Sequence, residues 1–388
     1  MKLILFDTTA ARNVLFPFTA IRPVADLRCG ILTLKERWRL LLHQPVDVLT
    51  DAYITDVVTG KTEEHLFIDA ALLPDNYIAQ AVTQLEMNQG WKKNGRLMAF
   101  KTTSKLSFGF TVADVASINF REYGNSVFFL NHAFEIMQMN ERMIRFDFDL
   151  LTRGKVSCPI SSTNSIINPE NIFLEEGVEM EYCTLNASNA CIYIGKNAFL
   201  MEGSLIRGSF AALENSVVKM GSKIYGATTA GKKCTVGGEI KNTVFFDYSN
   251  KAHDGYLGDA VIGSWCNLGA GTSASNVKNT AGVVKLWNPL FHQWMDAGNK
   301  CGLLMGDYSR TAINTSLNTG TVTGICCNIV SDGFPPKFLN HFTWNVQTGE
   351  KYDLQKALHD IDNWKKLKQQ GITDAEKQIL QYIYSQQS

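Results

Sequence analysis

Apolar residues recur at every sixth position through the middle of the chain. From 194 to 236 all eight positions of this spacing are apolar, and six of the eight positions four residues further on are small. The spacing returns over 262–274 and 305–329. A hexapeptide period predicts a left-handed parallel β-helix, in which three hexads form one triangular coil with the aliphatic residue inside and the small residue at a corner. A β-sandwich, the alternative, would show period-two alternation and does not explain eight consecutive apolar positions at period six.

The six-residue register breaks twice. The first break spans about residues 242–252, and the second spans about 276–304 and contains Trp287, Pro289 and Trp294. Because insertions into a repeat fold usually map to loops, we expect a nine-residue loop before His253 and a longer loop across the second break.

The segment 1–165 lacks the hexad period and alternates between two kinds of element. Strands are predicted at 2–6, 45–54 and 65–73, and helices at 33–43 and 76–88. Alternating strands and helices are typical of an open α/β sheet. Ligands of such sheets bind beyond the carboxyl ends of the strands, where Asp7, Asp51 and Asp69 would lie.

The C-terminal tail has the periodicity of two amphipathic helices. Apolar residues share one face over 354–367, Gly371 ends this helix, and Thr373 caps a second one. We expect these helices to serve packing or trimer formation. The predicted organisation is an α/β domain at 1–165, a β-helix at 166–345 and C-terminal helices at 346–388.

Composition narrows the class of protein. The 388 residues suggest roughly two to three domains. Thirty-seven basic residues balance 37 acidic ones, which argues against a dedicated nucleic-acid binder. No apolar run approaches the length of a membrane span, and the start lacks a signal-peptide pattern. None of the nine cysteines forms a CxxC pair. We therefore expect a cytoplasmic protein that uses reduced thiols as small buried side chains and lacks a structural zinc site.

Two segments resemble one known enzyme family. GEIKN (238–242), followed by KAHDGYLGDAVIGSWCNLGAGTSASN (251–276), resembles the acetyltransferase half of bifunctional N-acetylglucosamine-1-phosphate uridyltransferase/glucosamine-1-phosphate acetyltransferases. RNVLFPFTAIRPVADLRCGILTLKERW (12–38) resembles the nucleotidyltransferase start of an alternate bacterial branch of that family. The usual Gly-rich loop is absent, and Val24 stands where the signature lysine would be. The resemblance implies a divergent α/β nucleotidyltransferase-like domain followed by a left-handed β-helix acyltransferase.

The resemblance implies two catalytic residues in the β-helix. His253 matches the family's catalytic histidine, and an imidazole suits the removal of a proton from an attacking amine near neutral pH. Asn276 matches an asparagine near the acceptor amine. A structural histidine at a loop junction is the alternative for His253.

Four further residues match substrate-binding positions of the family. Lys241 matches a lysine that binds the sugar phosphate. Lys223, three hexads upstream in the six-residue count, replaces a phosphate-binding arginine and loses its bidentate geometry. Tyr256 and Asn267 match sugar- or phosphate-contacting positions. The alternative for each is a polar residue on a solvated face of the prism.

Acetyl-CoA in this family lies in a groove between adjacent β-helices, which implies a homotrimer. Gly269 and Ala270 would flank the thioester, where backbone amides stabilise the oxyanion, and Thr311, Ala312 and Thr315 would continue the groove. A γ-type carbonic anhydrase, the metal-dependent alternative, needs three histidine ligands. Residues 166–330 contain only two histidines, so we reject it.

The N-terminal half would need cations for a triphosphate and a carboxylate for Mg²⁺. Arg12, Arg22 and Arg28 could replace the missing loop and lysine, and Asp69 resembles the family's metal-binding aspartate. The segment 1–165 is short for the complete domain of this family, so a degenerate domain is the alternative.

The lead interpretation is a bifunctional enzyme of UDP-N-acetylglucosamine-type biosynthesis. It would acetylate glucosamine-1-phosphate, or a close relative, from acetyl-CoA and then couple the product to a nucleoside triphosphate. One alternative is an acyltransferase with a degenerate N-terminal domain. The other is a non-catalytic scaffold that binds sugar nucleotides.

Overall fold

The computed structural model describes residues 1–55 and 64–387, which divide into two compact units. Unit 1 comprises Met1–Arg28 and Leu32–Ala133, and unit 2 comprises Cys29–Ile31 and Phe134–Ser388. The helices that follow residue 133 therefore belong with the β-helix. The boundaries at 165 and 345 stay predictions.

Unit 1 is built on a six-stranded mixed sheet with the order β2-β1-β3-β6-β5-β7. The strands are β1 (Lys2–Phe6), β2 (Val46–Leu49), β3 (His65–Asp69), β5 (Gln89–Lys93), β6 (Arg96–Thr102) and β7 (Asn119–Glu122). Strand β1 runs parallel to β2 and β3, whereas β6 is antiparallel to β3. A separate pair joins β4 (Leu72–Leu73) to β8 (Phe128–Phe129). Phe67 stacks on Phe100 in the core, with ring centroids 5.1 Å apart.

The helices of unit 1 connect these strands. They are α1 (Thr9–Val14), α2 (Leu34–Leu42) and α3 (Asn76–Thr83), with 3₁₀ turns η1 (Val24–Asp26) and η2 (Val112–Val115). A capping box between Thr33 and Glu36 starts α2, because the side chains satisfy backbone N–H groups that the first turn leaves open. The predicted α/β architecture is confirmed, and the predicted helix at 76–88 ends earlier, at Thr83.

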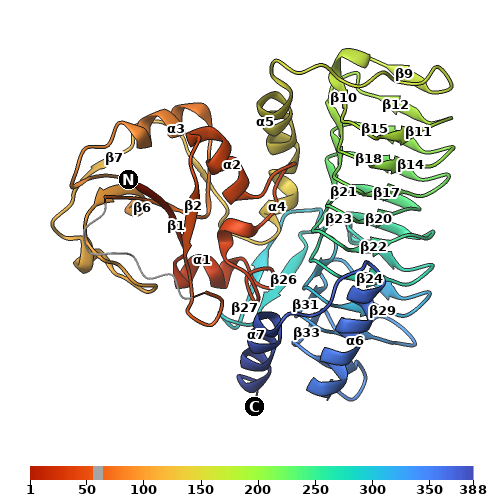
Figure 1. The fold of residues 1–388 in the computed structure, drawn as a ribbon. Coiled ribbons are helices and arrows are strands. Elements are labelled where there is room, and N and C mark those ends of the chain that lie inside the picture. Colours follow the sequence, from red (N-terminus) through yellow and green to blue (C-terminus); the bar gives the residue numbers. More distant parts are fainter. Residues whose placement is uncertain (56–63, 388) are drawn as a thin grey trace. The chain divides into compact units, whose positions relative to one another are not determined.

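Unit 2 is a parallel β-helix whose coils are stacked along the chain (Figure 1). Face 1 consists of β9 (Ser165–Ile167), β12 (Thr184–Asn186), β15 (Leu205–Arg207), β18 (Lys223–Tyr225), the first part of β21 (Glu239–Phe245) and of β23 (Tyr256–Ile262), β25 (Ser273–Ala274) and β30 (Ser316–Leu317). Face 2 consists of β10 (Ile172–Leu174), β13 (Ile192–Ile194), β16 (Phe210–Ala212), β19 (Thr228–Ala230), the second part of β21 and β23, β28 (Leu304–Met305), β31 (Val322–Thr323) and β33 (Phe338–Leu339). Face 3 consists of β11 (Glu179–Met180), β14 (Phe199–Leu200), β17 (Val217–Val218), β20 (Thr235–Val236), β22 (Asn250–Lys251), β24 (Asn267–Leu268), β29 (Arg310–Thr311) and β32 (Asn328–Ile329). The predicted hexad β-helix is confirmed.

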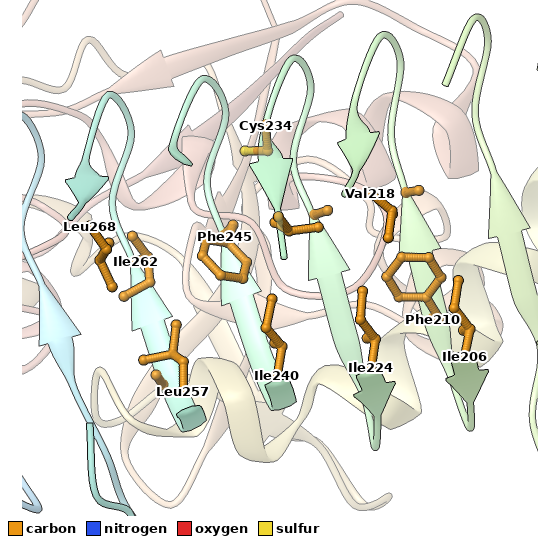
Figure 2. Packing of buried hydrophobic residues seen from close by; sticks show 14 of the residues in the cluster. Ile206, Phe210, Val218, Ile224, Cys234, Ile240, Phe245, Leu257, Ile262 and Leu268 are labelled. Atoms are coloured by element: carbon orange, nitrogen blue, oxygen red, sulfur yellow. The ribbon is translucent and has the colours of Figure 1, made fainter. Parts of the chain in front are cut away.

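The interior of the β-helix is a set of stacked apolar columns. Figure 2 shows Ile206, Ile224, Ile240 and Leu257 in one such row, at matching positions of successive coils. Burial of these side chains supplies the main favourable free energy of a repeat fold. The predicted cysteine role is also confirmed, since eight of the nine are buried and Cys158 is half-buried.

The first break in the hexad register is a shortened coil, not the predicted nine-residue loop. Strand β21 enters this stretch, turns the corner from face 1 to face 2 and ends at Phe245. Inward positions leading into the break are spaced four, then five residues apart, at Val236, Ile240 and Phe245. The six-residue spacing of inward positions changes because the corners contain fewer residues. The strands of the β-helix are not interrupted.

The second break projects from the coil, as predicted, and forms an antiparallel hairpin. Strands β26 (Lys285–Asn288) and β27 (Gln293–Asp296) pair across it, and the rings of Trp287 and Trp294 meet edge to face, 5.5 Å apart.

Helices cover two of the three faces. Helices α4 (Glu135–Gln138) and α5 (Asn140–Thr152) contact face 2, where Asn140 donates to the Ala227 carbonyl over 2.9 Å. Helix α6 (Leu354–Lys366) lies on face 3, with Trp364 against Arg310. Helix α7 (Asp374–Ser385) starts at a capping box on Thr373, as predicted. Among shorter elements, η3 (Pro169–Asn171) lies between β9 and β10, and β34 (Thr343–Asn345) pairs with β35 (Glu350–Lys351). Among the described residues, no helix has the length and apolarity that a membrane crossing requires.

Candidate active site

Face 1 brings two predicted substrate residues together. Two rows of outward side chains cross β18, β21 and β23: Lys223–Glu239–Tyr256 and Tyr225–Lys241–Gly258. The ring of Tyr256 folds over Gly258, because a Cβ atom on that glycine would lie 2.3 Å from the Tyr256 hydroxyl oxygen. Tyr256 therefore lies beside Lys241, whose strand neighbour is Gly258.

Lys223 lies in the row next to Lys241. The sequence count assumed three full hexads between the two lysines, whereas this coil is shorter and aligns Lys223 with Glu239. Tyr225 is consequently the residue aligned with Lys241. Lys223 instead lines a groove of about 680 Å³ together with Arg207, a cation that the sequence reasoning missed.

The electrostatics of this surface favour an anionic ligand at Lys241. The hydroxyl of Tyr225 donates to Glu239 over 2.7 Å, and this bond, with burial, raises the pKa of Tyr225 to about 12. The ammonium of Lys241 lies 5.7 Å from the centre of the Tyr225 ring. Within residues 1–55 and 64–387 no carboxylate pairs with Lys241. Its charge is available to a phosphate.

Asn276 is held at the corner that follows face 1. The buried carboxylate of Asp259 accepts a hydrogen bond from Asn276 and another, of 2.8 Å, from Asn242. Burial and then the charge of Asp259 raise the pKa of Tyr256. Asp259 thus connects Asn276 with the Tyr256–Lys241 surface. The sequence reasoning missed it, although it lies in the quoted motif as the acid of LGD.

His253 lies at the preceding corner, between β22 and β23, with an exposed side chain. Its backbone carbonyl accepts a 2.8 Å hydrogen bond from the ammonium of Lys251. Lys251 takes an inward position that other coils fill with Val236 and Leu268, and its ammonium also donates to the Gly237 carbonyl over 3.0 Å. The corner that carries His253 is therefore fixed from inside the β-helix. The sequence signal for these two hydrogen bonds was a lysine, Lys251, at a position that points into the β-helix.

This buried ammonium predicts a pH dependence of stability. Burial lowers the pKa of Lys251 from 10.5 to about 8. Between these values the unfolded chain binds more protons than the folded one, so the contribution of Lys251 to the free energy of unfolding rises with pH. Urea titrations of the wild type and Lys251→Met from pH 7.5 to 10.5 measure this. We expect the variant to lose part of the upward slope, and equal slopes would contradict the assignment.

The predicted acetyl-CoA residues lie one and two coils beyond His253, near the same corner. The Ala270 carbonyl accepts from the Asn314 amide, which keeps the successive corners in register. The Gly269 amide donates to the Thr311 hydroxyl over 3.0 Å and is thereby occupied within the protein. Thr311 and Thr315 are buried, whereas Ala270 and Ala312 reach the surface.

Asn267 lies apart from this surface in the single chain. It belongs to β24 on face 3, where it aligns with Asn250 and Arg310. The structure therefore groups Lys241, Tyr256 and Asn276 within one chain and leaves Asn267 on another face.

Two of the three predicted nucleotide-binding arginines, Arg12 and Arg28, are buried within unit 1. Arg12 forms a buried ion pair of 3.1 Å with Asp7, and its guanidinium also donates to the Thr50 hydroxyl, the Tyr53 hydroxyl and the Thr19 carbonyl. Burial raises the pKa of Asp7 to about 6 against the opposing effect of Arg12. The other two arginines differ in exposure: Arg28 is buried near Glu36, and Arg22 is half-buried.

A cavity of about 670 Å³ lies beyond the carboxyl ends of β1 and β3 in unit 1. Asp69 lines it, and Arg12, Arg22 and Arg28 do not. The guanidinium of Arg96 forms a two-point ion pair with Asp69, from Nε to Oδ2 over 2.7 Å and from Nη2 to Oδ1 over 3.1 Å.

This geometry does not fit the predicted Mg²⁺ site. Asp69 is the only carboxylate that lines the cavity among the described residues, and both of its oxygens already bind Arg96. A divalent cation at Asp69 would meet the guanidinium, a like charge, at the same oxygens. The described residues also contain no group of three potential metal ligands.

Comparisons with known proteins agree with the family resemblance found in the sequence. Residues 3–156 match the family model for sugar nucleotidyl transferase. Bifunctional GlmU proteins are similar over parts of the chain: that of Cyanothece sp. is 26% identical over 164 residues, which cover 37% of this chain and 36% of the relative. That of Synechococcus elongatus is 27% identical over 207 residues, which cover 47% and 41%.

The chain thus spans well under half the length of these curated relatives. The match to a crystal structure of Arabidopsis UDP-N-acetylglucosamine acyltransferase covers 47% of this chain and 66% of that protein's chain, with 16% sequence identity and a TM-score of 0.17. The sequence comparisons confirm the family resemblance: residues 3–156 match the sugar nucleotidyl transferase family, and the chain is similar to the bifunctional GlmU transferases.

Proposed function

We propose that this chain is a transferase that moves an acetyl group from acetyl-CoA to the amine of glucosamine-1-phosphate or a closely related amino-sugar phosphate. The observation that carries the proposal is the strand register of face 1, which sets Lys241 beside Tyr256. His253 stands exposed at the corner that leads into Tyr256, and Asp259 holds Asn276 at the corner that follows face 1.

Each group has a defined part in the proposed reaction. Lys241 binds the sugar phosphate as a point charge, and the Tyr256 hydroxyl contacts the sugar. The imidazole of His253 takes a proton from the amine as its nitrogen attacks the thioester carbonyl. A carbon–nitrogen bond forms, the carbon–sulfur bond breaks, and the thiolate leaves with the proton held on the imidazolium. Ala270, partly exposed at the corresponding corner of the next coil, would flank the thioester.

The direct test is thiol release from acetyl-CoA in the presence of amino-sugar phosphates. We expect turnover with glucosamine-1-phosphate or with another member of a panel of 2-amino and 4-amino sugar phosphates. Absence of turnover with every member would contradict the proposal and favour the non-catalytic scaffold.

Replacing Lys241 by methionine should raise KM for the sugar phosphate by about 10- to 100-fold and change kcat little. A charge-assisted hydrogen bond is worth about 1.5–3 kcal/mol, which corresponds to this range. Steady-state kinetics with varied sugar phosphate measure the effect. Lys196→Met, which removes an exposed lysine from an earlier coil, is the matched control. A KM equal to that of the control would exclude Lys241 from phosphate binding.

The second reaction, nucleotidyl transfer with release of pyrophosphate, is supported by the family match of residues 3–156. The Arg96–Asp69 ion pair instead favours the alternative, an acyltransferase whose N-terminal unit does not transfer nucleotides. Pyrophosphate release from a nucleoside triphosphate and an N-acetylated sugar phosphate, with Mg²⁺ present, separates the two.

The proposal also includes a homotrimer, in which Asn267 from one chain would complete the surface of another. Sedimentation equilibrium measures this oligomeric state.

A further inference from the structure

Arg96 is locked in position at the cavity of unit 1. Besides its two bonds to Asp69, it donates from Nη1 to the Asn131 side chain over 3.1 Å, and its guanidinium carbon lies 4.0 Å from the centre of the Phe129 ring. Asp69 is held in turn by the Ala71 amide over 2.9 Å. The carboxylate is almost fully buried, whereas 30% of the Arg96 side chain is exposed. The pair therefore has a buried side at Asp69 and an accessible side at Arg96.

The accessible side of Arg96 has hydrogen-bonding capacity left. A guanidinium carries five N–H groups, and three of them are used by Asp69 and Asn131. Within the described part of the chain the other two have no partner. Paired N–H groups of an arginine match the oxygens of a phosphate.

The rest of the cavity has a largely apolar wall. Its volume of about 670 Å³ falls in the range of small-molecule sites, and Phe6, Leu97, Phe110 and Val112 form much of its wall. Thr8, at the start of α1, supplies a hydroxyl on the same wall. An apolar pocket with one guanidinium at its edge combines a site for a nucleobase with a site for a phosphate.

We propose that this cavity is a metal-independent binding site for a nucleoside phosphate, in which Arg96 takes the place beside Asp69 that a divalent cation would otherwise need. Asp69 acts as the residue that positions Arg96. The site holds its ligand without carrying out nucleotidyl transfer, and it does not depend on the acetyl transfer proposed for unit 2.

The test is calorimetric titration of the full chain with the diphosphates of adenosine, guanosine, cytidine, uridine and thymidine, each in EDTA and in Mg²⁺. We expect at least one of them to bind in EDTA, with an affinity that changes less than about threefold when Mg²⁺ is added. Binding that requires Mg²⁺, or no binding of any of the five, would overturn the proposal.

Two variants test the role of Arg96 itself. Arg96→Gln should lower the affinity in EDTA by about 10-fold or more, the loss expected for a hydrogen-bonded charge pair. Arg96→Lys keeps the charge without the two-point geometry and should bind with an affinity between those of the wild type and Arg96→Gln. It also provides the test if the glutamine variant folds poorly. Arg121→Gln on the exposed strand β7 removes the same charge elsewhere in unit 1. Affinity of both Arg96 variants equal to that of this control would overturn the proposal.

Discussion

Replacing His253 by alanine is expected to lower kcat for acetyl transfer by about 10²- to 10⁴-fold, the usual contribution of a positioned general base. KM for the sugar phosphate should change little, because Lys241 and Tyr256 remain in place. The fold should tolerate the change, since the side chain is exposed and Lys251 binds the carbonyl of residue 253, not its ring. Initial rates of thiol release with saturating substrates measure the effect.

The matched control is His359→Ala, which removes an exposed histidine from α6. Its rates should stay within a factor of two of the wild type. If His253→Ala retained rates in the same range, the histidine would be a structural residue of its corner and another residue would have to act as the base.

The sequence was sufficient for the architecture wherever one local rule holds along many residues. The hexad period predicted the β-helix because each inward position obeys the same steric requirement, coil after coil. The same reasoning failed where the coil shortens. The four-residue step from Val236 to Ile240 moved Tyr225 into the place that counting gave to Lys223.

Contacts between distant segments were beyond the reach of sequence patterns. The clustering of Arg12, Arg22 and Arg28 along the chain suggested a triphosphate site, yet Arg12 is consumed by Asp7 and its neighbours inside unit 1. The cation that does reach the cavity, Arg96, comes from a strand 27 residues after Asp69. Its pairing is set by the antiparallel register of β3 and β6, which no local motif reveals.

The second large expected effect is on the free energy of unfolding, and it comes from the interior of the β-helix. Phe210 and Phe245 both point into the β-helix from face 2, two coils apart (Figure 2). The coil between them aligns Thr228 with Phe210 and Ala230 with Phe245. Large and small side chains thus alternate to fill the prism at the density of a protein interior. Because Ala230 is already small, its coil has no bulk with which to refill a space left by Phe245.

Phe245→Ala should therefore lower the free energy of unfolding by about 3–5 kcal/mol, the range for a phenylalanine removed from a core that relaxes little. Leu205→Ala, on the outward side of face 1 with 49% of its side chain exposed, is the control and should cost less than about 0.5 kcal/mol. Urea titrations of both variants measure the difference. Strand β21 carries both Phe245 and Lys241, so loosening its second half should weaken sugar-phosphate binding before the coil unfolds. A cost below about 1 kcal/mol for Phe245→Ala would mean that the neighbouring coils can close the cavity. We do not expect this closure, because β19 and β23 hold β21 in fixed parallel register from both sides.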